Sequence, residues 1–389
     1  MFFNYRSFFK ALDLALLRQP FRLRRWAYVV FFTALFLLFR GLVWAARALD
    51  HVVAPGFRRE PVAAPVFIIA PPRSGTSFLQ KLMSLDEERF VHWKMYHTIF
   101  PAVCLQRALD VLARVDDRLG APFARMLASG ERNWFGGWDD MHRMRLSEPE
   151  EDQALFVYAF AGEAVYMLFP FVDELWEVGF PDALPAAKRR PLMSYYRSCL
   201  QRQAHAHGKG RIMLVKSTCS AGAVEALAEA FPDARFITIV RHPAASIASH
   251  VSLFVPAWQA HSPEIPKNGA EAKSYAKLAV AWYRHLFRFG SRIAPERYYC
   301  IDYRDLARDP RGVVEALYRH FGWPIGASYR AQLDAVAQRQ RTYQSRHAYA
   351  LEDFGLSNDW IERELGDVIA AYGLNEDRCS ASRPLERSA

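Results

Sequence analysis

The longest apolar stretch of the chain lies near its start and predicts a helix. Residues 26–39 read WAYVVFFTALFLLF and carry no charge, but this run is shorter than the about 20 residues that cross a bilayer. Arg40 interrupts it, and apolar residues resume from Gly41 to Ala46. A crossing helix would therefore need Arg40 to extend to the membrane surface or to face protein.

The residues before this stretch predict an amphipathic helix at a membrane surface. Apolar side chains recur at approximately helical spacing and basic ones follow, namely Phe2, Phe3, Phe8, Phe9, Leu12 and Leu16, then Arg18, Arg22, Arg24 and Arg25. We therefore assign residues 1–50 as membrane-associated hydrophobic and amphipathic helices. The alternatives are a long helix docked on the rest of the fold and a cleaved signal peptide, and the long charged leader disfavours the second.

After a connector over residues 51–65, short apolar runs alternate with helical patterns. The runs that fit buried strands are Val66–Ala70, Ile212–Val215, Arg235–Val240 and Tyr298–Ile301. Helices are expected from Thr76, within residues 222–231 and within residues 310–321. Because strand, helix and strand in succession give parallel pairing, we predict an α/β fold whose parallel sheet is flanked by helices.

This α/β domain is predicted to span residues 66–379, with residues 380–389 as a flexible tail. Residues 101–211 are mostly helical in pattern and rich in aromatic side chains. We interpret them as a helical insertion that covers the strand ends and shapes a binding pocket.

Composition narrows the classes of partner. Of the 389 residues 51% are apolar, including 10 Trp, 17 Tyr and 28 Phe, which excludes a disordered chain. The net charge of +9 suits an anionic ligand, an anionic membrane or nucleic acid, but the sequence contains no nucleic-acid recognition motif. The five cysteines are scattered without a C-x-x-C pair, so we predict no metal site and a reducing compartment.

The segment APPRSGTS, residues 70–77, has the composition of an anion-binding loop. It lies between an apolar strand and a helix and follows the register of G-x-x-x-x-G-K-[ST], but Ala70 replaces the first glycine and Thr76 the lysine. Arg73 brings the positive charge into the loop. The other groups that can contact an anion are the Gly75 backbone and the hydroxyls of Ser74, Thr76 and Ser77. The fold is therefore predicted to be of the P-loop type.

A later strand ends in a cation where ATP-using enzymes carry a carboxylate that organises magnesium. Arg241 stands at this strand end, and Ser249 follows eight residues later, about two turns along the next helix. A guanidinium and a hydroxyl so placed can hold one phosphate. This pair disfavours a P-loop kinase or NTPase, which remains an alternative, as does a non-catalytic, membrane-associated nucleotide-binding scaffold.

Three segments together resemble the PAPS-dependent sulfotransferase family, particularly its bacterial-type members (PAPS is 3'-phosphoadenosine 5'-phosphosulfate). They read PPRSGTSFLQ, LVKSTCSAGAVEALAEAFPDA and RFITIVRHPAASIASH, and the resemblance covers residues 66–373. It implies that Arg73, Ser74, Gly75, Thr76 and Ser77 hold the 5'-phosphosulfate, that Arg241 and Ser249 hold the 3'-phosphate, and that Lys216 lies near the donor or the acceptor. The closing segment HAYALEDFGLSNDWI is also similar to the family and implies that Arg346, His347 and Tyr349 lie near the nucleotide.

The activity expected from this resemblance is transfer of a sulfuryl group from PAPS to an acceptor hydroxyl, without a metal. Arg73 and Lys216 are suited to stabilise the developing negative charge. A base must take the hydroxyl proton, and the candidates in order are His142, His97, His92 and Glu150. Glu150 belongs to the element SEPEEDQ, which is similar to an acidic box of the family or serves as a helix start. The chain departs from the family pattern at residues 93–94, where relatives often carry an acidic residue.

The donor also constrains the topology. PAPS is made in the bacterial cytosol, so a bacterial enzyme must keep its catalytic domain on that side. A single span with the basic leader inside would place Val66 onward on the opposite side. We therefore expect an interfacial arrangement on the cytoplasmic face, where a lipid-like or lipid-linked alcohol could enter, whereas a Golgi-type eukaryotic enzyme would accept a single span. The sequence leaves the identity of the acceptor and the oligomeric state open.

Overall fold

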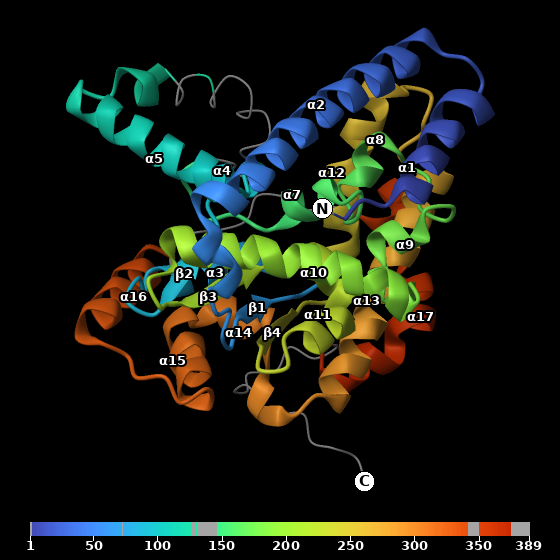
Figure 1. Ribbon diagram of the computed structural model, residues 1–389. Helices are drawn as coiled ribbons and strands as arrows, with labels where there is room; N and C mark the ends of the chain where they lie inside the picture. Colours follow the sequence, from blue (N-terminus) through green and yellow to red (C-terminus); the bar gives the residue numbers. More distant parts are fainter. Residues whose placement is uncertain (1, 72, 127–129, 131–145, 341–349, 375–389) are drawn as a thin grey trace.

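A five-stranded parallel sheet forms the centre of the protein in a computed structural model, which describes all residues except 1, 72, 127–129, 131–145, 341–349 and 375–389 (Figure 1). The strand order is β2-β3-β1-β4-β5, and every pairing is parallel. The strands are β1 (Val66–Ile68), β2 (Phe90–His92), β3 (Ile212–Lys216), β4 (Arg235–Val240) and β5 (Tyr298–Asp302). The predicted α/β class and four of these strands are confirmed, and β2 was not predicted.

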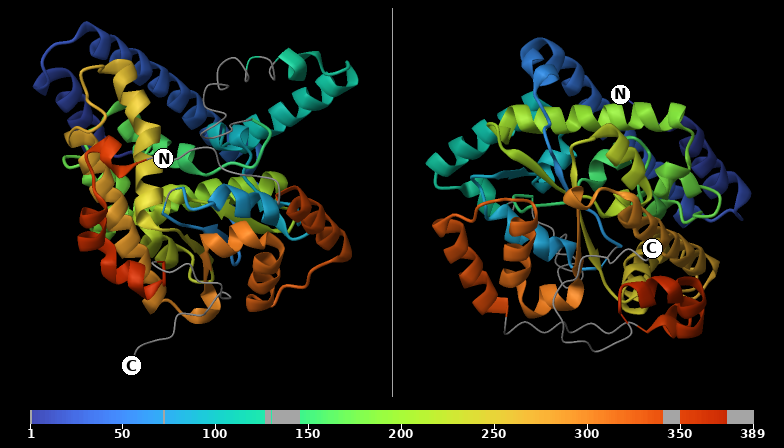
Figure 2. Two further views of the ribbon diagram at one scale, coloured as in Figure 1. Left: turned by 180° about the vertical axis from the view of Figure 1, so that it is seen from behind. Right: turned by 90° about the horizontal axis from the view of Figure 1, so that it is seen from below.

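Helices cover both faces of the sheet (Figures 1 and 2). Up to β3 the α-helices are α1 (Tyr5–Leu12), α2 (Leu23–Val53), α3 (Thr76–Ser84), α4 (Met95–Ile99), α5 (Val103–Arg118), α7 (Gln153–Tyr158), α8 (Val165–Leu168), α9 (Trp176–Gly179) and α10 (Ala186–Gln203). After β3 they are α11 (Val224–Ala230), α12 (Pro243–His261), α13 (Ala270–Arg292), α14 (Tyr303–Arg308), α15 (Pro310–His320), α16 (Ala327–Gln340) and α17 (Asn358–Ala371).

Single 3₁₀ or π turns join several of these helices. They are η1 (Asp13–Arg18), η2 (Pro55–Arg59), η4 (Pro181–Ala183), η5 (Ala204–Gly208), η6 (Thr218–Ala223), η7 (Pro295–Arg297) and η8 (Leu351–Phe354). The predicted connector thus contains the end of α2 and the turn η2, and the predicted insertion contains α5 and α7 to α10.

The strands read as continuous apolar runs because both faces of the sheet are buried. Val66 and Ile68 pack into a core with α3, α15 and α16, whereas Phe67 and Ile69 pack into a larger core with α10 to α13. The alternation follows from the two-residue period of a strand. The parallel register also brings the carboxyl ends of β1, β3 and β4 to one edge, which is the usual position of ligands in such sheets.

The long helix α2 lies against the protein along its whole length. Its protein-facing positions recur every three or four residues, namely Arg25, Val29, Thr33, Phe36, Arg40, Val43, Arg47 and Asp50. At its start Arg25 forms an ion pair of 3.0 Å with Glu264. Near its end Asp50 pairs with the buried Arg202 at 2.7 Å and accepts hydrogen bonds from the first backbone N–H groups of α5.

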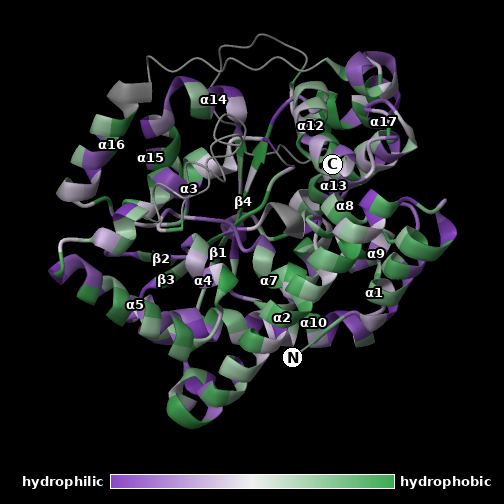
Figure 3. Ribbon diagram, turned by 90° about the horizontal axis from the view of Figure 1, so that it is seen from above, coloured by the Kyte–Doolittle hydropathy of each residue, from purple (hydrophilic) through white to green (hydrophobic). Residues whose placement is uncertain are grey.

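Arg40, which interrupts the apolar run, faces the protein. Its Nε donates to the backbone oxygen of Tyr158 at 3.2 Å, and its guanidinium lies 4.2 Å from the centre of the Phe3 ring. The guanidinium is therefore held by protein groups on this side of the helix. The opposite face of α2 exposes the apolar side chains of Val30, Phe31, Phe32, Leu35, Leu38, Phe39, Leu42, Trp44 and Leu49. Figure 3 colours the ribbon by the hydropathy of each residue.

Within the described residues α2 is the helix that is long and apolar enough to cross a membrane by length and composition. The apolar residues in and just before α1 do not form one exposed face, because Phe3 and Phe8 are buried in the protein core and Phe9 is exposed. Exposed apolar side chains also lie on α5, which diverges from α2 in Figure 1, namely Val111, Leu112 and Val115.

Candidate active site

The predicted anion-binding loop connects the carboxyl end of β1 to the N-terminus of α3. Gly75 precedes the helix with φ of 88°, and a Cβ atom there would lie 3.0 Å from the ring of Tyr303. Both facts require glycine at this position. Arg73 also has a positive φ, 63°, a backbone conformation that residues other than glycine rarely adopt.

Arg73, Arg241 and Ser249 converge, although they come from three different elements. Arg73 Nε donates to Ser249 Oγ at 3.1 Å, and the Arg241 guanidinium donates to the Arg73 backbone oxygen at 2.9 Å. Within the described residues Arg241 contacts this carbonyl and the Tyr303 ring, 4.6 Å away, and no carboxylate. Two guanidinium groups beside a helix N-terminus have the charge and the donors that suit an anion with several negative charges.

Two tyrosines that the sequence analysis missed hold this arrangement in place. Tyr303 lies between Gly75 and Arg241, and Tyr283 of α13 donates its hydroxyl to the Arg241 backbone oxygen at 3.0 Å. Burial raises the pKa of Tyr283, which keeps the hydroxyl protonated as a donor. Tyr303 directly follows β5, so a search of residues just beyond each strand could have found it. Tyr283 lies within a helix and offers no such signal.

Lys216 ends β3 and connects the loop to the acidic element SEPEEDQ. Its Nζ donates to Ser77 Oγ at 2.7 Å and lies 3.5 Å from a Glu151 oxygen and 3.8 Å from a Glu150 oxygen. The lysine is only 3% exposed. A buried cation therefore stands between the predicted anion-binding loop and two carboxylates. In this arrangement the lysine is suited to stabilise negative charge at the loop, and the carboxylates are suited to accept a proton.

Among the predicted base candidates, Glu150 lies next to Lys216, with its carboxylate 3.8 Å from the lysine nitrogen. His92 and His97 lie at the end of β2 and in α4, and burial lowers the pKa of His92 to about 4 and that of His97 to about 2. Both are weak bases in this environment. His142 lies outside the described residues, as do Arg346, His347 and Tyr349, so these predictions stay open.

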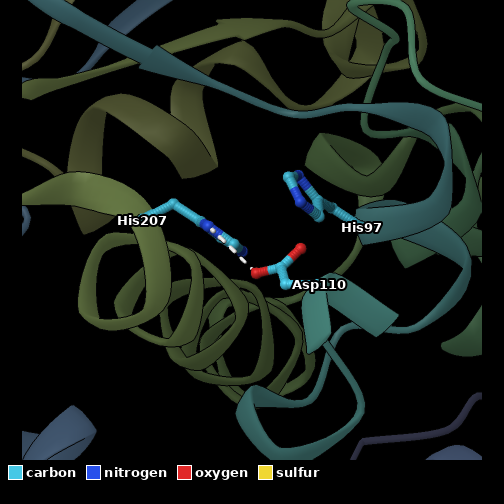
Figure 4. A group of neighbouring side chains, drawn as sticks. All are labelled: His97, Asp110 and His207. Carbon is cyan, nitrogen blue, oxygen red and sulfur yellow. Dashed lines mark ion pairs between the residues drawn. The ribbon is translucent and has the colours of Figure 1, made fainter. Parts of the chain in front are cut away.

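His97, Asp110 and His207 form a separate cluster, drawn in Figure 4, with one possible ligand atom of each within 4.8 Å of the others. The backbone N–H of Lys94 donates to His97 Nδ1 at 3.2 Å, so the neutral ring carries its proton on Nε2 and has no lone pair there for a metal. The two imidazole rings also stack, with centroids 4.4 Å apart and an angle of 27°, so their nitrogen lone pairs do not converge. We interpret the cluster as polar packing between α4, α5 and η5.

Asp152 fixes the acidic element to the end of β3. Its carboxylate accepts hydrogen bonds from Tyr196 at 2.5 Å and from Ser217 at 2.8 Å, and its backbone N–H donates to the Lys216 oxygen at 3.2 Å. The side chain is fully buried, and this burial raises the pKa of Asp152 from 3.8 to about 7. Glu150 and Glu151 are thereby held beside Lys216.

Replacing Asp152 by Asn is expected to change how stability depends on pH. Between the two pKa values, about 3.8 and about 7, the unfolded chain has released the proton that the folded protein retains, so the free energy of unfolding of the wild type falls as pH rises. The amide cannot titrate, so the free energy of unfolding of the variant should rise relative to that of the wild type by up to roughly 4 kcal/mol as pH increases across this window. Urea denaturation at several pH values measures this, and parallel profiles for the two proteins would contradict it.

Comparison with known proteins gives consistent results. A family model described as "Sulfotransferase family" matches residues 65–327. Over 363 residues the chain is 25% identical to omega-hydroxy-beta-dihydromenaquinone-9 sulfotransferase Stf3 of Mycobacterium bovis and of Mycobacterium tuberculosis, which covers 90% of this chain and 85% of that protein.

Two solved structures share the fold. Sulfotransferase STF9 from Mycobacterium avium superposes with a TM-score of 0.69 at 18% identity, covering 98% of this chain and 99% of that one. Sulfotransferase STF1 from Mycobacterium tuberculosis gives a TM-score of 0.66, also at 18% identity, covering 93% and 92%.

Proposed function

The chain belongs to the sulfotransferase family, and from this premise we propose that it transfers a sulfuryl group from PAPS to a hydroxyl of a lipid-like or lipid-linked acceptor. The observation that carries the choice of donor is the convergence of Arg73, Arg241 and Ser249 at the strand ends. A donor with an additional 3'-phosphate suits this cationic site, whereas a magnesium nucleotide requires a carboxylate where Arg241 stands.

We assign the donor contacts as follows. Arg241 and Ser249 bind the 3'-phosphate, and the 5'-phosphosulfate lies against the loop residues Arg73, Ser74, Gly75, Thr76 and Ser77. The backbone N–H groups at the start of α3 add their dipoles to this second anion. Arg346 and Tyr349 are proposed to contact the nucleotide from the closing segment.

The reaction is an in-line displacement at sulfur. The acceptor oxygen forms a new bond to sulfur as the bond from sulfur to the bridging phosphate oxygen breaks, and the electron pair of that bond leaves with 3'-phosphoadenosine 5'-phosphate (PAP). Lys216 and Arg73 stabilise the charge on the leaving oxygen and the sulfuryl oxygens. Glu150 or Glu151, within 4 Å of Lys216, takes the hydroxyl proton, and His142 is the alternative base.

The proposed acceptor class follows from the relatives and from α2. Stf3 is named as a sulfotransferase of omega-hydroxy-beta-dihydromenaquinone-9, which supports a hydroxylated, lipid-like acceptor here. The apolar outer face of α2 supports contact with a membrane, and its ion pairs at both ends favour a helix that lies in the interface over one that spans it. We place the catalytic domain on the cytoplasmic side of the membrane. A protease added to sealed vesicles should therefore digest this domain in inverted vesicles and leave it intact in right-side-out vesicles.

Release of PAP from PAPS in the presence of excess EDTA tests the reaction class. We expect turnover to be unchanged by the chelator, because cationic side chains take the role that magnesium has in kinases. Loss of turnover that magnesium restores would contradict the proposal and favour the P-loop kinase. PAP binding without any turnover would favour a non-catalytic scaffold.

A further inference from the structure

An apolar cavity lies between α2 and α7. It has a volume of about 280 Å³. Its walls include Phe36 and Phe39 of α2, Ile99 of α4, and Gln153, Ala154 and Val157 of α7. Gln153 and Val157 are four positions apart, so one face of α7 forms this wall. The aromatic and aliphatic lining suits a hydrocarbon chain and offers little to a charged group.

One end of this α2–α7 cavity meets the apolar outer face of α2. Phe39 belongs to both, because it lines the cavity and is 36% exposed. Leu35 and Leu42 lie one helical turn to either side of it and are also exposed. A chain that lies along this face of α2 can therefore enter the cavity without crossing a polar surface.

Gln153 of the cavity wall lies close in sequence to the proposed reaction centre. Gln153 is the first residue of α7, and Glu151 stands two positions before it, so their Cα atoms are at most about 7 Å apart. Glu151 in turn lies 3.5 Å from Lys216, which contacts the anion-binding loop. The cavity wall and the carboxylates proposed to activate the acceptor therefore belong to neighbouring positions of one segment.

We propose that the α2–α7 cavity binds the apolar chain of the acceptor next to its hydroxyl, and that the chain arrives from the bilayer along α2. This inference rests on the proposed function. The acceptor is then an amphiphilic alcohol with an unbranched or isoprenoid chain attached to the reacting carbon. Each methylene that enters the cavity should raise kcat/KM about three- to fourfold until the cavity is filled.

The first test measures transfer from PAPS to unbranched primary alcohols of increasing chain length, using the full chain in nanodiscs. For the wild type we expect kcat/KM to rise with length and then level off. In Val157→Trp, whose indole takes up part of the cavity and narrows it, this rise should be lost, whereas kcat/KM for the shortest alcohol and the Kd for PAP should be unchanged. Unchanged PAP affinity also shows that the variant folds. Val111→Trp on the exposed face of α5 is the matched control and should behave as the wild type.

A second measurement does not depend on turnover. A long-chain alcohol that carries a photoreactive diazirine should crosslink to residues 36–39 and 153–157 in the wild type, and Val157→Trp should abolish this labelling. Labelling without turnover of any alcohol would refute the proposed function and leave the binding site standing. Turnover that is independent of chain length, or labelling elsewhere in both proteins, would overturn the inference and leave the proposed function intact.

Discussion

Replacing Arg241 by Ala is expected to weaken the binding of PAP by about 100-fold, or about 2.7 kcal/mol, while the affinity for adenosine 5'-phosphate stays within a few-fold of the wild type. The guanidinium converges with Arg73 and Ser249 and is assigned to the 3'-phosphate, which only PAP carries. Isothermal titration calorimetry with both nucleotides gives the two affinities. The wild type should prefer PAP strongly, and the variant should not distinguish the two.

Arg235 provides a matched control on the same strand. It stands at the opposite end of β4, and its guanidinium lies 5.0 Å from the centre of the Trp323 ring, much as that of Arg241 lies over Tyr303. Arg235→Ala removes a similar cation–aromatic contact, so it reports the effect on the fold alone. Equal affinities of the wild type for both nucleotides, or an equal loss of PAP affinity in both variants, would contradict the assignment of Arg241.

Replacing Lys216 by Met is expected to lower kcat by about 10² to 10³-fold, with the Kd for PAP changed only a few-fold. Methionine keeps an apolar stem of similar size in this buried position but removes the charge next to Ser77, Glu150 and Glu151. The expected split follows because the charge that Lys216 stabilises develops only in the transition state. Steady-state kinetics with saturating PAPS, together with PAP titration, measures both quantities.

Lys81 is the control for this variant. It pairs with Glu148 of the same acidic element at 3.4 Å, but it is largely exposed, so Lys81→Met should leave kcat nearly unchanged. An unchanged kcat in Lys216→Met would remove the lysine from the mechanism. A loss of PAP affinity as large as the loss of kcat would make it a donor-binding residue instead.

The sheet could be predicted from sequence because four of its strands are apolar runs bounded by helical patterns. β2 was missed because Phe90–His92 holds only two apolar residues, whereas β1 lies in the five-residue apolar run Val66–Ala70, and because it continues into Trp93 and Lys94 without a turn signal. The direction in which the N-terminal helices face could not be predicted either. Helical spacing of Phe3 and Phe8 indicates an apolar face, but it does not distinguish a lipid surface from the protein core, where both side chains lie.

The candidate site also has one part that could be predicted from sequence and one part that could not. The anion-binding loop and the Arg241–Ser249 pair could be predicted because each is a short motif at a strand end, and the parallel register brings those ends together. The pairing of Lys216 with Glu151, and the contact of Tyr283 with Arg241, join segments far apart in the chain. A single sequence carries no signal for such contacts, which depend on how α7 and α13 pack.

The most direct test of the central claim compares two labelled donors in one assay. The protein is incubated with a membrane lipid extract and either PAPS labelled at sulfur or ATP labelled at its γ-phosphate, each with magnesium or with excess EDTA. We predict that labelled sulfur appears in the organic phase under both conditions, that the Lys216→Met protein produces far less of it, and that ATP gives no product. Transfer of labelled phosphate that requires magnesium, together with no transfer of labelled sulfur, would contradict the account.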